Sequence, residues 1–204
     1  MDKIFLVLVS VLMLAACGRA PQEEGCLLAE ENHLEDADFS LEAQSNRSKF
    51  WTGIQHAGEK SFAVGIADGI VYIDKVGSQP WFLYRQRMRA DDLAGQKIAF
   101  SAEVRLVERA TDVAEREGRP GGIKLAVLAG GGSRLYLGQR LESDRPPEEW
   151  QSLQIIAQLR PSTETLELSF LHESDGVLQV RRPSLRLVDP VSIGCKVTAA
   201  PKKR

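Results

Sequence analysis

Residues 97–106 read Lys-Ile-Ala-Phe-Ser-Ala-Glu-Val-Arg-Leu, and this stretch decides the fold class. Apolar side chains occupy every second position, and polar or small side chains lie between them. Successive side chains of a β-strand point to opposite faces of its sheet, so a period of two predicts a strand with one buried face. The side chains expected in the core are Ile98, Phe100, Ala102, Val104 and Leu106.

The same alternation recurs on both sides of this strand. Further strands are predicted over residues 70–76, 81–89, 123–129, 134–141, 153–159, 166–171 and 177–188. Turn-forming residues separate them, most clearly Gly130-Gly131-Gly132, which predicts a tight hairpin, and Asp175-Gly176. Residues 108–117 have helical character and are expected to form an excursion between two strands. Many short strands with such punctuation indicate an all-β sandwich or barrel.

Length and charge limit the organisation of the chain. Its 204 residues carry a formal net charge of −2, which gives no global field for binding nucleic acid. Residues 26–195 are the right size for one domain with a sizeable core. Acidic residues crowd the region from Glu23 to Glu42, whereas residues 196–204 form a basic C-terminal tail that ends in Lys202-Lys203-Arg204.

The N-terminus has Lys3, an apolar segment over residues 4–14 and the tetrapeptide Leu14-Ala15-Ala16-Cys17. The apolar segment is shorter than the roughly 20 residues that span a bilayer, so it is expected to be a signal peptide. The tetrapeptide resembles the lipobox of bacterial lipoproteins. The alternative is an ordinary secretory signal with a coincidental cysteine.

The lipobox resemblance implies a location and a partner. A lipoprotein signal peptide over residues 1–16 would be removed, and Cys17 would be acylated, so that membrane lipid is the partner that anchors the chain. Residues 17–25 would then be the lipidated cysteine and a polar tether. The implied localisation is the cell envelope, and Gly18 after the cysteine favours the outer membrane of a Gram-negative cell.

Two further cysteines, Cys26 and Cys195, flank the predicted domain. An exported chain folds where disulfides persist, so the two are candidates for one disulfide bond. Two unpaired thiols are the alternative.

The order of the segments is similar to that of galactose-binding-like jelly rolls, particularly the CBM4/9 carbohydrate-binding modules. The segments that carry this resemblance are Leu34–Leu41 as an opening strand, Gln86 with Leu93–Arg105, Trp150–Leu153, Leu166–Phe170, Gly176–Val180 and Ser184–Leu185. The resemblance covers residues 34–188 and implies a jelly-roll β-sandwich and a non-catalytic module. In that fold the chain ends lie side by side, which agrees with pairing of Cys26 and Cys195.

Two departures from this family bear on function. Arg181 and Arg182 stand where the family commonly has two carboxylates, which argues against a bound cation there. Asp36-Ala37 replaces the family's Asn-Gly in the opening segment, and alanine does not favour a positive φ.

Residues with catalytic or metal-binding potential are scattered. His33, His56 and His172 have no metal-ligand spacing, and no nucleophile elbow is present. We therefore predict no enzyme, no metal and no cofactor. A hydrolase using two carboxylates across a cleft remains the alternative to a binding module.

The most suggestive surface is the outer face of the predicted strand over residues 81–89. If Phe82, Tyr84, Gln86 and Met88 face the core, Trp81, Arg85 and Arg87 project outward, and Glu103 and Arg105 are expected to project likewise from a second strand. An exposed tryptophan stacks on sugar rings, and arginine forks bond hydroxyls or carboxylates. Solubilising arginines and core-capping tryptophans are the alternative, with Trp51 and Trp150 expected in the core or at strand ends.

Two functions follow from these patterns. The first is a membrane-anchored extracytoplasmic lipoprotein whose non-catalytic module binds envelope or exported polysaccharide. The second is a cell-envelope lipoprotein that uses the sandwich as a platform for a partner protein.

Overall fold

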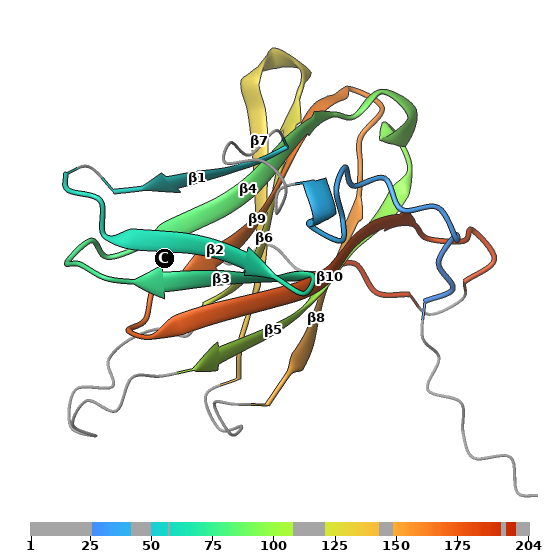
Figure 1. Ribbon diagram of the computed structural model, residues 1–204. Helices are drawn as coiled ribbons and strands as arrows, with labels where there is room; N and C mark the ends of the chain where they lie inside the picture. Colours follow the sequence, from blue (N-terminus) through green and yellow to red (C-terminus); the bar gives the residue numbers. More distant parts are fainter. Residues whose placement is uncertain are drawn as a thin grey trace, which may run out of the picture.

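The computed structural model describes residues 26–41, 50–56, 58–107, 121–142, 149–192 and 195–198 (Figure 1). The predicted signal peptide, Cys17, the tether, the helical excursion and most of the basic tail lie outside the described residues. In the part that is described, no helix is long and apolar enough to cross a membrane.

The described strands form two antiparallel five-stranded sheets (Figure 1). The first sheet has the order β1-β4-β9-β6-β7 and the second the order β2-β3-β10-β5-β8. The fold is therefore the predicted all-β jelly-roll sandwich. The strand bounds are β1 Trp51–Gln55, β2 Phe62–Ala67, β3 Ile70–Lys75, β4 Phe82–Arg89, β5 Lys97–Val107, β6 Gly122–Ala129, β7 Ser133–Arg140, β8 Gln151–Gln158, β9 Thr163–His172 and β10 Val177–Leu187.

All eight strands predicted from alternation are present, and the Gly130–Gly132 hairpin joins β6 to β7 as predicted. Leu34–Leu41 was wrongly predicted as an opening strand, because residues 35–38 form turns. A side-chain oxygen of Asp36 accepts the backbone N–H of Leu41 at 2.9 Å, and such local bonds compete with a strand ladder. Asp36 itself takes the positive φ of 49°, so Ala37 does not need to.

The core between the sheets is centred on aromatic rings. Trp51 is fully buried, with its ring stacked 5.1 Å from that of Phe170 and 5.7 Å from that of Tyr84. The predicted core side chains of β5 are all buried, including Phe100, whose ring lies 6.2 Å from Phe170. Trp51 is thus a core residue, as predicted.

The two ends of the domain meet at a disulfide. Cys26 and Cys195 are bonded, with their Cα atoms 5.1 Å apart and 169 positions apart in sequence. The N-terminal segment pairs with the end of β10, since the N–H of Ala29 donates to the carbonyl of Leu187 at 2.9 Å. Both half-cystines pack beside Ile156 on the second sheet. The predicted pairing is confirmed, and the terminal segments cover one end of that sheet's outer side.

One short crossing decides which surfaces the neighbouring strands β4 and β5 serve. β4 ends at Arg89 in the first sheet, a 3₁₀ turn over Asp91–Leu93 follows, and β5 begins at Lys97 in the second sheet. Leu93 is buried, which holds this turn against the core. The outward side chains of β4 and β5 therefore point to opposite sides of the sandwich.

Candidate functional site

The predicted direction of the side chains of β4 is confirmed. Phe82, Tyr84 and Gln86 are buried, which leaves Arg85 and Arg87 on the outer side of the first sheet. Trp81 directly precedes β4 and is partly buried. The Trp81 and His56 rings are nearly perpendicular, with their centroids 6.2 Å apart, and His56 Nδ1 lies 3.2 Å from the side-chain oxygen of Gln79.

Glu103 and Arg105 do not join this group. They lie on β5 in the second sheet, so they face away from Trp81, Arg85 and Arg87. The expectation that all five residues share one surface is wrong, because the chain crosses between the sheets from β4 to β5 instead of forming a hairpin. The structure divides the predicted residues between two faces.

The first-sheet face consists of outward side chains on four adjacent strands: Trp81, Arg85, Arg87, Lys124, Tyr136 and Glu167. Register places Arg87 opposite Glu167 on β9, which lies opposite Ala126 on β6, which lies opposite Tyr136 on β7. A guanidinium nitrogen of Arg85 donates to the Glu167 carboxylate at 2.6 Å, so this ion pair crosses the middle of the face.

The aromatic rings stand at opposite ends of the first-sheet face. Tyr136 is 50% exposed, and the side chain of Ala126 beside it is only a methyl group. Strand spacing and rise place the Cα atoms of Trp81 and Tyr136 about 25 Å apart, with Arg85 and Lys124 in between. The face therefore offers two separated aromatic platforms with hydrogen-bonding groups along the way.

The second-sheet face consists of Tyr72, Glu103, Arg105, Trp150, Gln179, Arg181 and Arg182. Tyr72 lies opposite Gln179, and Gln179 lies opposite Arg105. The Arg105 and Arg181 guanidinium groups lie 4.5 Å and 4.1 Å from the centre of the Trp150 ring. Trp150 thus stands at a strand end, as predicted, where it orders two arginines on the outer face.

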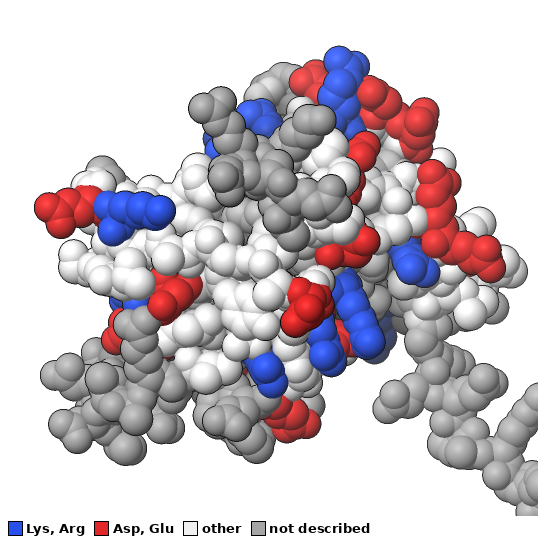
Figure 2. Space-filling model, viewed as in Figure 1, with Lys and Arg blue, Asp and Glu red and all other residues white. Residues whose placement is uncertain are grey.

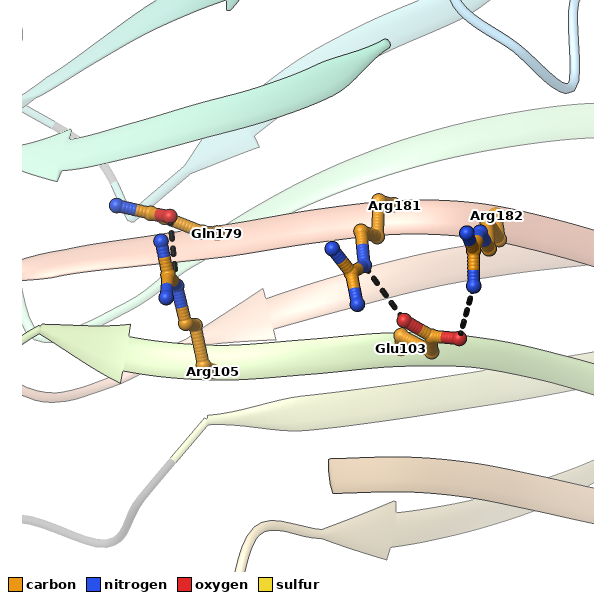
Figure 3. Close-up of polar contacts among 5 residues, drawn as sticks. All are labelled: Glu103, Arg105, Gln179, Arg181 and Arg182. Carbon is orange, nitrogen blue, oxygen red and sulfur yellow. Dashed lines mark hydrogen bonds and ion pairs between the residues drawn. The ribbon is translucent and has the colours of Figure 1, made fainter. Parts of the chain in front are cut away.

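The arginines of the second-sheet face are held by polar contacts as well (Figure 3). Arg105 donates through Nε to the side-chain oxygen of Gln179 at 2.9 Å. Arg181 and Arg182 donate to the two carboxylate oxygens of Glu103 at 2.5 Å and 3.0 Å. Partial burial opposes ionisation of Glu103, but the hydrogen bonds and charges of these two arginines outweigh it and hold the pKa of its carboxyl below the usual range.

On the side of the molecule that Figure 2 shows, acidic side chains gather along the upper right edge, and basic and acidic side chains lie near one another elsewhere. In the described part of the chain, no group of three His, Cys, Asp or Glu side chains is placed to hold a metal. His172 lies in the core, with its Nε2 atom 3.1 Å from the Gly176 carbonyl. Burial lowers the pKa of His172 to about 4.

Sequence reasoning missed several residues of both faces. Glu167, Lys124 and Tyr136 alternate with core residues on predicted strands, so alternation alone could have placed them outward. Their meeting with Arg85 and Arg87 depends on strand order, which alternation does not contain. Tyr72 and Gln179 were missed for the same reason.

Comparison with known proteins supports the fold. No family model matches the chain, and no curated protein matches it. The enzymatically active domain of tailspike protein 4 from bacteriophage CBA120 is similar, with a TM-score of 0.56 and 12% identity; the match covers 77% of this chain and 21% of the tailspike chain. A CBM4 structure matches with a TM-score of 0.50 and 15% identity over 76% of this chain and 99% of that one.

A xylan-binding domain from CBM 22 matches with a TM-score of 0.48 and 12% identity over 72% of this chain and 92% of that one. At these identities the tailspike domain and the CBM4 structure show the fold alone. The chain has a jelly-roll fold of the kind found in carbohydrate-binding modules.

Proposed function

We propose that this protein is a non-catalytic carbohydrate-binding lipoprotein of the cell envelope. Its first-sheet face binds an envelope or exported polysaccharide, and acylated Cys17 anchors it, in the outer membrane if the cell is Gram-negative. The jelly-roll fold and its CBM4-like architecture support the module, and the sequence around Cys17 supports the anchor.

The chemistry of the first-sheet face suits a sugar chain. Aromatic rings stack on the apolar side of a pyranose, and Trp81 and Tyr136 offer rings far enough apart to contact different residues of one chain. Arg87 is exposed and able to donate to sugar hydroxyls or carboxylates, while Arg85 is held in place by Glu167. The observation that carries the proposal is this Arg85–Glu167 pair between two aromatic side chains on one sheet.

Two ion-paired carboxylates on this side of the described structure support binding without catalysis. Glycoside hydrolysis requires two carboxyl groups across the scissile bond, one of them able to give a proton. Glu167 is ion-paired with Arg85, and Glu173, directly after β9, is ion-paired with Arg140.

Retention of the full chain in polysaccharide-containing native gels tests this function. We expect retardation by at least one glycan of a panel of neutral and acidic envelope polysaccharides. Trp81→Ala and Tyr136→Ala should each weaken binding about tenfold, since stacking contributes on the order of 1 kcal/mol or more. Arg160→Gln is a suitable control because Arg160 is exposed and lies in the β8–β9 connection. Unchanged retention in both aromatic variants, with an unchanged melting temperature, would overturn the proposal.

The anchor needs a separate test. Metabolic labelling with a radioactive or clickable fatty acid should mark the native chain, and Cys17→Ser should abolish the label and release the domain from the membrane fraction. Label retained by the Cys17→Ser variant would contradict lipidation at this cysteine.

A protein-binding platform is the second candidate function. The edge strand β7 is exposed along nearly its whole length, with Leu135 39% and Tyr136 50% exposed. A free strand edge with apolar side chains is a surface on which a partner strand is able to pair. Co-purification of a defined envelope protein, lost in Leu135→Lys, together with no response to any glycan, would favour this function over the first.

A further inference from the structure

The second-sheet face has the features of a prepared site for an anion. Its side chains form a row across four strands, from Tyr72 on β3 through Gln179 and Arg105 to Trp150 beside β8. The row is about 14 Å long, taken as three strand spacings. The terminal segments pack beside Ile156 near the disulfide, at the other end of this sheet's outer side from the row.

The guanidinium groups of this row are held before any ligand arrives. The Trp150 ring stacks against the guanidinium groups of Arg105 and Arg181. The Nε atom of Arg105 donates to the side-chain oxygen of Gln179, and the Nε atom of Arg181 donates to the carboxylate of Glu103. A contact at Nε fixes the plane of a guanidinium group, and a planar guanidinium group matches the two oxygens of a carboxylate. An arginine ordered in this way loses less entropy on binding.

A β-bulge adds a third cation to the same face. The pairing of β10 with β5 shifts between Arg181 and Ser184, and Arg182 adopts a left-handed φ of 51°. In a regular strand Arg182 would point to the opposite side from Arg181, but here both reach Glu103. A positive φ is unfavourable for arginine, so other contacts must hold it.

Asn32 from the N-terminal segment holds this bulge. Its amide donates to the carbonyl of Pro183 at 3.2 Å, and its side-chain oxygen accepts the N–H of Leu185 at 2.9 Å. The strained Arg182 thus lies beside the carboxylate of Glu103, which binds two guanidinium groups, and Arg105 lies farther along β5 from Glu103 (Figure 3). Bulges and strained residues concentrate at functional sites because they re-aim side chains.

We propose that the second-sheet face is a second ligand site that binds the carboxylates of an acidic polysaccharide. Arg105 and Arg181 bind a uronate carboxylate, and Tyr72 provides the stacking surface for the next sugar ring. Tyr72 is accessible for this because its neighbour across β2 is Gly65, where even an added Cβ would meet open space. This site lies on the opposite side of the sandwich from the first-sheet face and does not depend on it.

Trp150 provides a direct test. In a Trp81→Phe background of the full chain, Trp150 becomes the tryptophan that reports ligand binding, because Trp51 is fully buried. Titration with oligogalacturonate, a linear uronic acid oligomer, should give a saturable change in emission, whereas the methyl-esterified oligomer should give none. Arg105→Gln and Arg181→Gln should each raise the titration midpoint about tenfold, and the matched control Arg160→Gln should leave it unchanged.

Each result decides a separate question. If Trp150 responds to oligogalacturonate while Trp81→Ala and Tyr136→Ala leave polysaccharide retention unchanged, only the function proposed for the first-sheet face is removed. Equal midpoints for acid and ester, or for Arg181→Gln and the background, would overturn the second site, provided that melting temperatures show a folded protein. The second site is also overturned if Arg105→Gln releases a co-purifying protein while oligogalacturonate causes no change in emission.

Discussion

The two outer faces use the same kinds of residue in different arrangements. On the first-sheet face, Arg85 is paired with Glu167 while the half-exposed ring of Tyr136 stands apart. On the second-sheet face, the ring of Trp150 is covered by Arg105 and Arg181. An aromatic ring left open favours stacking on any sugar, whereas a ring that supports guanidinium groups favours negative charge. Arrangement, more than composition, therefore distinguishes the two faces.

The largest expected effect is a loss of stability when the disulfide is removed, because the disulfide holds the terminal segments that pack on the second sheet. Replacing both Cys26 and Cys195 by Ser removes a link that closes a 169-residue span. The chain-entropy model gives a loss of about 5 kcal/mol in the free energy of unfolding. Urea unfolding followed by fluorescence measures it. A midpoint equal to that of the native protein would show that the bridge is not what joins the ends.

Protonation of His172 in the core should destabilise the whole domain and therefore affect both faces equally. His172 lies between the sheets with a pKa of about 4, below the ordinary value of 6.5. The unfolded chain therefore binds the proton first, and stability that is present above pH 6.5 is lost as the pH falls toward 4, by about 3 kcal/mol. Unfolding curves between pH 7 and pH 4, taken with His172→Gln as the comparison, measure this loss. A slope that persists unchanged in His172→Gln would contradict the assignment to this histidine.

Loosening the bulge should weaken binding at the second-sheet face alone. Asn32→Ala removes two hydrogen bonds at β10, which costs about 2 kcal/mol and frees Arg182 from its position beside Glu103. Binding of oligogalacturonate at the second-sheet face should weaken, while polysaccharide retention by the first-sheet face stays the same. Parallel measurements of both activities check this, and Asn32→Asp, which keeps the acceptor for Leu185, should have the smaller effect. Equal losses at both faces would mean that Asn32 supports the whole fold.

Salt should produce the smallest and most graded difference. At about 1 M ionic strength the Debye length falls to about 3 Å, so contacts between exposed charges weaken more than stacking does. Binding at the second-sheet face should fall with salt more steeply than binding at the first-sheet face. Titrations of a neutral and an acidic glycan at several salt concentrations measure the two slopes. Identical slopes would mean that the two faces do not differ in their dependence on charge.

Alternation predicted the strands in which it is regular and missed those in which it is not. β5 has a polar or small side chain at every outward position from Lys97 to Arg105, so its inner face was evident, whereas β2 reads Phe-Ala-Val-Gly-Ile-Ala without alternation and lies at a sheet edge. β1 is short and contains Gly53, where a Cβ would lie 2.4 Å from the Phe82 ring. The close packing that requires this glycine is a long-range contact that local pattern cannot reveal.

Half of the candidate site was accessible to the same reasoning. The outward direction of Arg85 and Arg87 followed from alternation on β4. Glu103 and Arg105 lie on the other sheet because the chain crosses between the sheets at Asp91–Leu93, and alternation does not predict this crossing. The bulge at Arg182 likewise depends on Asn32, which lies 150 positions away in sequence.

The indole N–H signals of the three tryptophans test the central claim most directly. In a ¹⁵N spectrum of the protein titrated with an acidic oligosaccharide, the Trp81 signal should move because it belongs to the first-sheet face, and the Trp150 signal should move with the second. The signal of the fully buried Trp51 should stay in place. A Trp81 signal that stays fixed with every glycan of the panel, in a protein whose spectrum shows a complete fold, would contradict polysaccharide binding at the first-sheet face.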